Sequence, residues 1–383
     1  MALMVWLGCS RVWAGEALPE PDRRAPLILY TAFAGERLKP LIAEIKASLK
    51  IEVTVIQVDK DNLLTRLLPN DLQPVPDLVL VPEVGRLERL AASGLIRPLH
   101  GADMPPEVAN DLRVASERIP PQWQIAHKKW LTVAKFSQVI VVSRYRPQTR
   151  NLSRTVELGS KDFAERICPT TQVTSPSFRL LVTNILKQNG HEATRNWLEQ
   201  VVKNMVVEGS NQAEGVKKDG LEEERILQQF LLRQCDIALV SSRALARRLE
   251  AETGNSASLL DQSRMIWADG FTLGATSAKE PSPAKKTKAS DLGVTMDGIG
   301  LALTSQSTHS REAAEVANFL LGETGQRLLA AALWSYPIIE GVPLSNPVAR
   351  LGPFTPADTE LDRLIPLFDE AAAIANMVAE KQE

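Results

Sequence analysis

At 383 residues the chain is long enough to form two lobes, each with its own hydrophobic core. Its 44% hydrophobic and 23% charged residues are ordinary values for a globular protein and argue against wholesale disorder. The net charge of −2 argues against the broad basic surface of a nucleic-acid-binding protein, so we expect no nucleic acid as a partner.

The N-terminus has features of an export signal. Residues 2–8 are apolar, and VWAGEA (12–17) contains two small-residue patterns typical of signal-peptidase cleavage. We predict a signal peptide over residues 1–17 and a periplasmic or extracytoplasmic mature protein; a frayed apolar terminus is the alternative interpretation. Cys9 follows Leu7-Gly8, so lipid anchoring at Cys9 is a further alternative. No other stretch approaches the roughly 20 apolar residues that span a bilayer.

The first part of the chain alternates strand and helix patterns. Strands are predicted at 27–32, 51–58 and 77–81, and helices at 35–49 and 83–93, with Gly94 ending the second helix. This β-α-β-α-β-α order predicts an α/β fold with a mainly parallel sheet and crossover helices. A looser, proline-containing region without a predicted helix follows at 101–121, and residues 130–143 are predicted to form strands near a crossover between lobes.

A second α/β set begins at 166–175. Helices are predicted at 176–188, 192–204 and 222–234, and a buried strand runs into a basic helix over 235–250. A polar Pro/Lys-rich surface loop is predicted at 279–290, a strand at 298–304, two helices broken near Gly322 over 310–333, and a terminal helix at 361–381.

Two cysteines remain if the leader is removed. Cys168 and Cys235 each lie on or beside a strand-like run, so a disulfide between them is plausible in an oxidising compartment. Two reduced, buried cysteines that behave as small hydrophobic residues are the alternative.

The search for catalytic motifs finds none. The four histidines are scattered, none has metal-ligand spacing with another, and no nucleophile elbow, P-loop or dinucleotide-binding glycine motif follows a strand. We therefore predict that the protein is not an enzyme and needs no resident cofactor.

Small polar residues recur where strands or loops give way to helices. They occur in YTAFAGE, VPEVG, PTTQVTSPS and VSSRA, each before a predicted helix. Helix N-termini present unpaired N–H groups, so several of them facing one crevice make an anion pocket. Plain N-capping by Ser and Thr is the alternative interpretation for any single junction.

The order of these motifs resembles that of bacterial extracellular solute-binding proteins of ABC importers, in particular the periplasmic ferric-ion-binding group. The resemblance runs from about residue 27 to near the C-terminus and is carried by LILYTAFAGERLKPLIAEI, PDLVLVPEVGRLERLAASGLIRPL, QCDIALVSS and GIGLALTSQSTHSREAAEVANFLLGETGQRLL. It implies a two-lobed type II periplasmic-binding-protein fold, with lobe 1 over 26–112 plus 270–335 and lobe 2 over 113–269 plus 336–383. It also implies a hinge, a ligand cleft between the lobes, and delivery of the ligand to an ABC permease in the inner membrane. We expect a monomer.

The resemblance also implies a departure in the ligands. The ferric group holds iron largely through tyrosines that cluster just after the motif that here is CDIALVSS, where this chain has Arg243. Only three tyrosines are present, Tyr30, Tyr145 and Tyr336. Glu83 lies near the group's acidic position and is the one metal-ligand candidate. Ferric iron needs several anionic oxygen donors, and an arginine at the phenolate position repels it.

We therefore expect an anion or chelated iron as the ligand, with ferric iron possible as transported cargo. The predicted ligand-binding residues are those at the strand-to-helix junctions: Thr31, Phe33, Glu83, Thr170, Thr171, Ser175, Ser241, Ser242 and Arg243. Arg243 would clamp an anion, unless it points to solvent like an ordinary residue at an exposed helix start. Two functional alternatives are a divergent sensor or interaction protein on the same fold, and a direct ferric-ion binder through non-tyrosine oxygen ligands.

Overall fold

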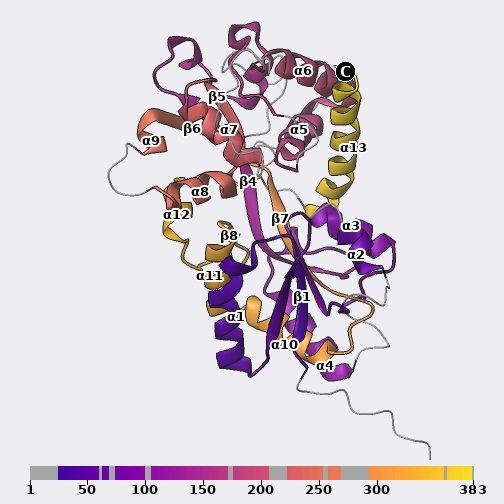
Figure 1. Ribbon diagram of the computed structural model, residues 1–383. Coiled ribbons are helices and arrows are strands. Elements are labelled where there is room, and N and C mark those ends of the chain that lie inside the picture. Colours follow the sequence, from indigo (N-terminus) through magenta and orange to yellow (C-terminus); the bar gives the residue numbers. More distant parts are fainter. Residues whose placement is uncertain are drawn as a thin grey trace, which may run out of the picture.

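The computed structural model describes residues 25–59, 63–68, 74–99, 105–170, 176–206, 222–252, 258–268, 293–357 and 360–381. The predicted signal peptide, Cys9 and the 279–290 loop lie outside these ranges. Figure 1 shows two lobes joined by the long strands β4 and β7. None of the helices in the described ranges has the length and apolar character needed to cross a membrane.

The strands form one mixed sheet in the described part of the chain, with the path β2-β1-β3-β7-β4-β5 and with β6 and β8 paired to β4. Their bounds are β1 (Leu27–Thr31), β2 (Val53–Gln57), β3 (Leu78–Val81), β4 (Leu131–Ser143), β5 (Ile237–Ser241), β6 (Ser263–Trp267), β7 (Met296–Leu303) and β8 (Tyr336–Pro337). β1 pairs in parallel with β2 and β3, as the β-α-β pattern predicts. The remaining strand pairs are antiparallel, so the sheet is mixed and the expectation of a mainly parallel sheet is corrected.

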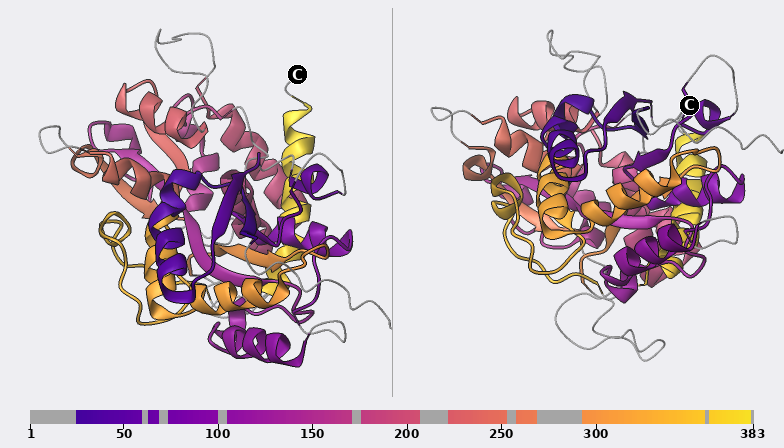
Figure 2. Two further views of the ribbon diagram at one scale, coloured as in Figure 1. Left: turned by 60° about the horizontal axis from the view of Figure 1, so that its bottom comes forward. Right: turned by 90° about the horizontal axis from the view of Figure 1, so that it is seen from below.

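Helices cover both faces of the sheet, as the two views of Figure 2 show. Their bounds are α1 (Gly35–Leu49), α2 (Leu63–Leu67), α3 (Val84–Ala92), α4 (Pro106–Glu117), α5 (Pro176–Asn189), α6 (His191–Lys203), α7 (Glu222–Leu231), α8 (Ser242–Glu250), α9 (Leu259–Gln262), α10 (Ser310–Leu320), α11 (Glu323–Ala332), α12 (Asn346–Ala349) and α13 (Leu361–Ala379). Short 3-10 turns are η1 (Pro121–Trp123), η2 (Pro147–Thr149), η3 (Thr155–Gly159) and η4 (Lys161–Phe163). α13 packs against α5 and α6 of the upper lobe in Figure 1 and α3 of the lower one.

The helix α4 corrects the expectation of a loose segment at 101–121. Its prolines stand at and just before its first residue, where a missing N–H costs nothing. Val108, Leu112 and Ala115 are buried at helical spacing. The proline content of the segment hid this apolar face.

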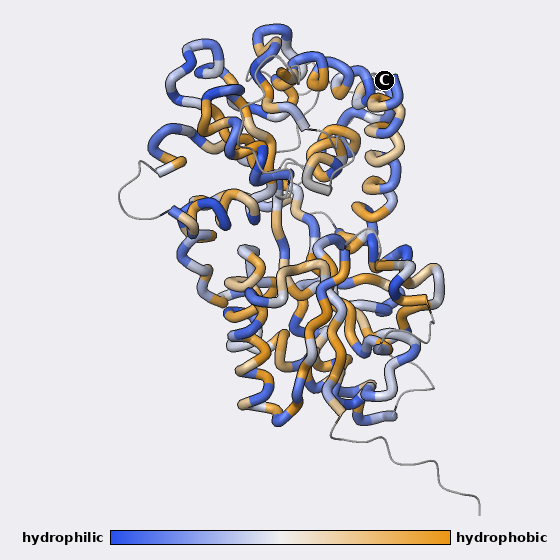
Figure 3. Tube along the Cα trace, in the orientation of Figure 1, coloured by the Kyte–Doolittle hydropathy of each residue, from blue (hydrophilic) through white to orange (hydrophobic). Residues whose placement is uncertain are grey.

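The strand β4 is a single element of 13 residues that belongs to both lobes. Its first half pairs with β7 up to Ser137, and its second half pairs with β5 and β6 from Gln138 onward. Val139 and Val141 face one hydrophobic cluster, whereas Ile140 and Val142 face another that includes α5, α6 and α13. Much of the trace of the strands has the colour of hydrophobic residues in Figure 3. β4 thus connects two cores.

The glycines of the GIG sequence in β7 allow α3 to approach the sheet closely. A Cβ atom at Gly298 would lie 2.7 Å from Val84 Cγ1 and 2.8 Å from Thr132 Cγ2. A Cβ atom at Gly300 would likewise clash with Leu87 Cδ1. These glycines therefore bring the N-terminus of α3, where Glu83 lies, against β7.

Candidate functional site

The loop after β1 is shaped by a buried threonine. Thr31 is fully buried, its hydroxyl donates to the Leu80 carbonyl at 2.9 Å, and it accepts from the Phe33 amide at 3.2 Å. Thr31 thus fixes the turn that places the Phe33 ring at the junction between the lobes.

Arg243, in the first turn of α8, reaches across this junction. Its Nε donates to the Leu333 carbonyl at 2.9 Å, and its guanidinium carbon lies 4.7 Å from the Phe33 ring centroid and 5.5 Å from that of Phe136. Burial lowers the pKa of Arg243 to about 10, so the side chain is still a cation at neutral pH. The side chain is packed against the other lobe, and the interpretation as an exposed helix start is excluded.

The two serines before Arg243 hold protein elements together. The Ser241 hydroxyl caps α8 by accepting from the Ala244 amide at 3.1 Å, and it donates to Glu223 at 3.0 Å. The Ser242 hydroxyl accepts from the Ser137 amide of β4 at 3.1 Å. Both serines are buried, so their hydroxyls already act as structural groups.

The junction before α5 is only partly described. The Thr170 hydroxyl donates to Glu222 at the start of α7. Thr171 and Ser175 lie outside the described residues. Cys168 and Cys235 form a disulfide with an S–S distance of 2.00 Å. This disulfide links the junction to the segment just before β5.

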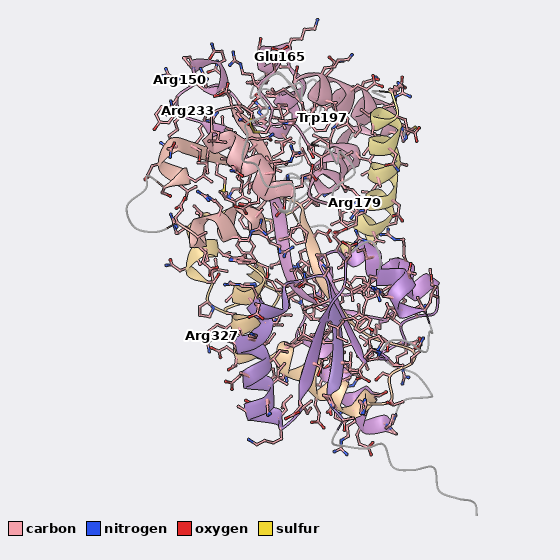
Figure 4. The ribbon with its side chains drawn as sticks, viewed as in Figure 1. Arg150, Glu165, Arg179, Trp197, Arg233 and Arg327 are labelled. Carbon is pink, nitrogen blue, oxygen red and sulfur yellow. A yellow bond between two sulfur atoms is a disulfide. The ribbon has the colours of Figure 1, made fainter. Side chains whose placement is uncertain are left out.

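A group of buried charges lies where α3, α5 and β7 meet. Glu83 and Arg179 are 1% and 8% exposed, and Glu83 Oε2 accepts from Arg179 Nη2 at 2.5 Å. Arg86 Nε lies 3.5 Å from the same oxygen. Figure 4 shows Arg179 between α5 and α3, so this ion pair spans the two lobes. Glu83, predicted as a ligand residue, is thus already paired with arginine.

Asp297 of β7 is the second carboxyl group of this cluster. It is 2% exposed and accepts from the Gly298 amide at 2.7 Å. Burial, together with the nearby Glu83 carboxylate, raises the pKa of Asp297 to about 7. The proton that Asp297 retains reduces the negative charge of the cluster.

The cluster therefore has an excess of positive charge. Arg86, Arg179 and Arg243 carry three guanidinium groups against the two carboxyls of Glu83 and Asp297, and Glu83 acts electrostatically on both Arg243 and Asp297. Glu223 also lies close to Arg243 as a counter-charge, and the neighbouring Arg247 is paired with Glu224 at 2.7 Å. Guanidinium groups at such a junction can hold an anion through charge-assisted hydrogen bonds.

Sequence reasoning missed Arg179 and Asp297. Arg179 could have been noticed as an arginine within the apolar sequence FRLLV. Asp297 could have been noticed as a carboxylate at the start of β7, a fully buried strand. Neither signal identifies its partner, because Arg179 and Glu83 are 96 residues apart.

The three tyrosines are dispersed. The Tyr30 hydroxyl donates to the Pro74 carbonyl at 2.9 Å, and Tyr145 is 57% exposed with Arg233 stacked 4.9 Å from its ring centroid. Tyr336 packs against Phe354, and burial raises the pKa of its phenol. No group of three or more His, Cys, Asp or Glu side chains in the described ranges is arranged to hold a metal ion.

The chain has a two-lobed, mixed α/β fold of the type II periplasmic-binding-protein type, which is similar to that of ferric-iron-binding proteins. The chain is 22% identical over 358 residues to Iron uptake protein A1 of Synechocystis sp. (strain ATCC 27184 / PCC 6803 / Kazusa), covering 93% of this chain and 88% of that one. No protein-family model matches the chain.

Solved structures share the same fold. A Bordetella ferric binding protein superposes with a TM-score of 0.69 at 19% identity, over 92% of this chain and 99% of that one. A Trichodesmium protein (IdiA, FutA) in complex with iron and citrate ligands superposes with a TM-score of 0.70 at 17% identity, over the same shares of the two chains.

Proposed function

We propose that this chain is the solute-binding component of an ABC importer and that it binds a small carboxylate, or iron chelated by carboxylates, between its two lobes. It would act outside the cytoplasm and deliver the ligand to a membrane permease. The single observation that carries the choice of ligand is the position of Arg243, a half-buried cation over the Phe33 ring and close to the Phe136 ring at the junction of the lobes.

Three further observations support an anionic ligand. The neighbouring Glu83, Arg86, Arg179 and Asp297 side chains leave an excess of positive charge beside Arg243. The tyrosines that would bind bare ferric ion are dispersed, as described above. Likeness to an iron uptake protein and to a structure that holds iron and citrate makes a chelate a natural candidate.

Thermal melting tests this proposal directly. The purified chain is heated with ferric chloride, ferric citrate, citrate, phosphate or sulfate. A ligand at 100 times its dissociation constant stabilises the folded state by roughly 2.7 kcal/mol, which shifts the melting temperature measurably. We expect a shift with citrate or ferric citrate, and a shift with ferric chloride alone would support direct capture of ferric ion instead.

Two arginine variants make the test specific. Arg243→Gln removes the cation at the junction, and we expect it to abolish the shift. Arg327→Gln is the matched control, because Arg327 is an exposed residue of α11 that lies away from the junction in Figure 4. An unchanged shift in Arg243→Gln would contradict the proposed site.

A further inference from the structure

Three buried polar side chains near the middle of β4 have atoms without hydrogen-bond partners. Gln138 is fully buried, and neither its Oε1 nor its Nε2 has a partner. Asn184 Oδ1 and Thr295 Oγ1 are also buried and unpartnered, with residue exposures of 0% and 2%. An unpaired buried polar group is costly, so four such atoms indicate a place where a polar molecule binds.

Backbone contacts bring these three residues close together in the fold. The Ala268 amide donates to the Gln138 carbonyl at 3.1 Å, and Asn184 Nδ2 donates to the Ala268 carbonyl at 3.2 Å. The Ser137 hydroxyl donates to the Thr295 carbonyl at 2.7 Å, and Ser137 pairs with Met296. Extending this antiparallel register by one residue places Thr295 opposite Gln138.

The same face of the sheet carries the charged cluster. Side chains alternate along a strand, so Gln138 lies on the face of Phe136, which pairs with Asp297. Arg243 stacks on Phe136, and Arg179 lies on α5, the helix that also carries Asn184. The unpartnered side chains therefore lie on the face of the sheet that carries Asp297, beside the proposed anion site.

The chemistry of the three side chains favours an uncharged partner. The Gln138 amide and the Thr295 hydroxyl each offer both a donor and an acceptor, whereas Asn184 offers Oδ1 because its Nδ2 is engaged by Ala268. A hydroxyl group has one donor and two acceptor lone pairs, which this set satisfies.

We propose that Gln138, Asn184 and Thr295 form a hydroxyl-binding subsite beside the anion site, so that the ligand is a hydroxycarboxylate, free or bound to iron. This inference rests on the proposed function above. The ligand's carboxylates face Arg243 and Arg179, and its hydroxyl group satisfies the amides of β4 and α5.

The first test compares two fully buried glutamines in the ligand-free protein. Gln326 uses its whole amide, donating to the Val133 and Leu320 carbonyls at 2.8 Å and accepting from the Ile338 amide at 2.8 Å. Gln326→Met should therefore lower the melting temperature clearly. Gln138→Met removes only unpaired atoms, so the melting temperature should stay the same or rise. A loss in Gln138→Met as large as that in Gln326→Met would overturn the proposal, because it would show that the Gln138 amide is already bonded, for example to buried water.

The second test uses pairs of ligands that differ by one hydroxyl: malate against succinate, and citrate against tricarballylate, each with and without ferric ion. Calorimetry of the wild type should show at least about 10-fold tighter binding of the hydroxylated member, since a site that bonds a hydroxyl rejects the analogue that lacks it. Gln138→Met should bind both members of a pair equally. Equal binding by the wild type would overturn the subsite.

Failure of the subsite and failure of the proposed function remain distinguishable. If both members of a pair bind the wild type equally and Arg243→Gln loses both, the anion site stands and the hydroxyl subsite is wrong. If none of the four carboxylates binds, with or without ferric ion, the choice of a carboxylate ligand is wrong and the hydroxycarboxylate inference falls with it.

Discussion

Among the described residues, Glu83 makes the shortest of the ion pairs between the lobes and is buried. Its replacement leaves the buried Arg179 guanidinium without this carboxylate. Breaking a buried ion pair from one side typically costs about 3–5 kcal/mol. We expect Glu83→Gln to lose stability of this order in urea unfolding.

Glu36 supplies the control for that measurement. Its pair with Lys39 joins side chains that are 80% and 70% exposed, so Glu36→Gln should cost less than about 1 kcal/mol. Equal costs for the two variants would mean that the Glu83–Arg179 pair is solvated in solution.

Asp297 gives stability a pH dependence of defined sign. The folded protein keeps this carboxyl protonated up to about pH 7, whereas the unfolded chain releases the proton near the ordinary value of 3.8. The folded state therefore binds more protons between these values, and the contribution of Asp297 to stability falls as the pH rises through this range. Above about pH 7 this contribution of Asp297 to stability is fully lost.

Asp297→Asn keeps an uncharged acceptor and should remove most of this fall. Urea unfolding measured from about pH 4 to about pH 8 should give nearly equal stabilities at the acid end and a more stable variant at the alkaline end. The charged groups that face Asp297, namely Glu83 and Arg179, are unchanged in the variant. Parallel stability curves for the two proteins would contradict the raised pKa.

At the scale of elements, the packing of α3 on β7 depends on small residues. Gly298 lies between Val84 and Thr132, whose branched side chains have little freedom to move. Gly298→Ala should cost about 1–3 kcal/mol of unfolding free energy through overpacking. Because α3 carries Glu83 before its first residue, the same variant should weaken ligand binding.

Gly35 at the start of α1 is the matched control for this change. A Cβ there would meet Val55 Cγ1 at 3.7 Å, an ordinary van der Waals distance. Alanine is a better helix former than glycine, so Gly35→Ala should leave stability unchanged or raise it by up to about 1 kcal/mol. A similar loss in both variants would show that close approach of α3 is not the cause.

At the scale of the whole molecule, α8 bridges the lobes through Glu250. Glu250 pairs with Arg37 at 3.0 Å and accepts from Trp334 Nε1 at 2.9 Å, while Arg37 lies over the Trp334 ring. These side chains are partly exposed, so the contribution to closure is at most about 1 kcal/mol. We expect Glu250→Ala to speed ligand dissociation by up to about 5-fold in stopped-flow measurements.

Two controls test whether the Glu250 ion pair slows ligand dissociation: high salt concentration, and a variant that removes an ion pair within one helix. At about 1 M salt the wild type should approach the variant, because exposed charges are screened over a few ångströms. Glu315→Ala removes an ion pair within α10 and should leave the dissociation rate unchanged. A dissociation rate that does not differ between wild type and Glu250→Ala would exclude this bridge as a closure contact.

The sequence by itself determined most of the elements and the class of fold. Apolar residues at helical spacing predicted α1 over its full range, and the strand runs predicted β1, β2, β3 and β5, because these patterns are local. The helix α4 was not predicted, because the prolines at its start indicated a loose segment although apolar residues follow them at helical spacing. The order of motifs also indicated the two-lobed architecture.

The tertiary structure alone decided which polar groups meet. Glu83 and Arg179 are paired, and Gln138 and Asn184 are linked through the Ala268 backbone, although each pair is far apart in the chain. Hydrogen bonding and desolvation depend on distance and burial, neither of which is encoded in the spacing of a local motif. The strand-to-helix junctions could therefore be predicted from the sequence, whereas the charges and unpaired amides that define the site became visible only in the fold.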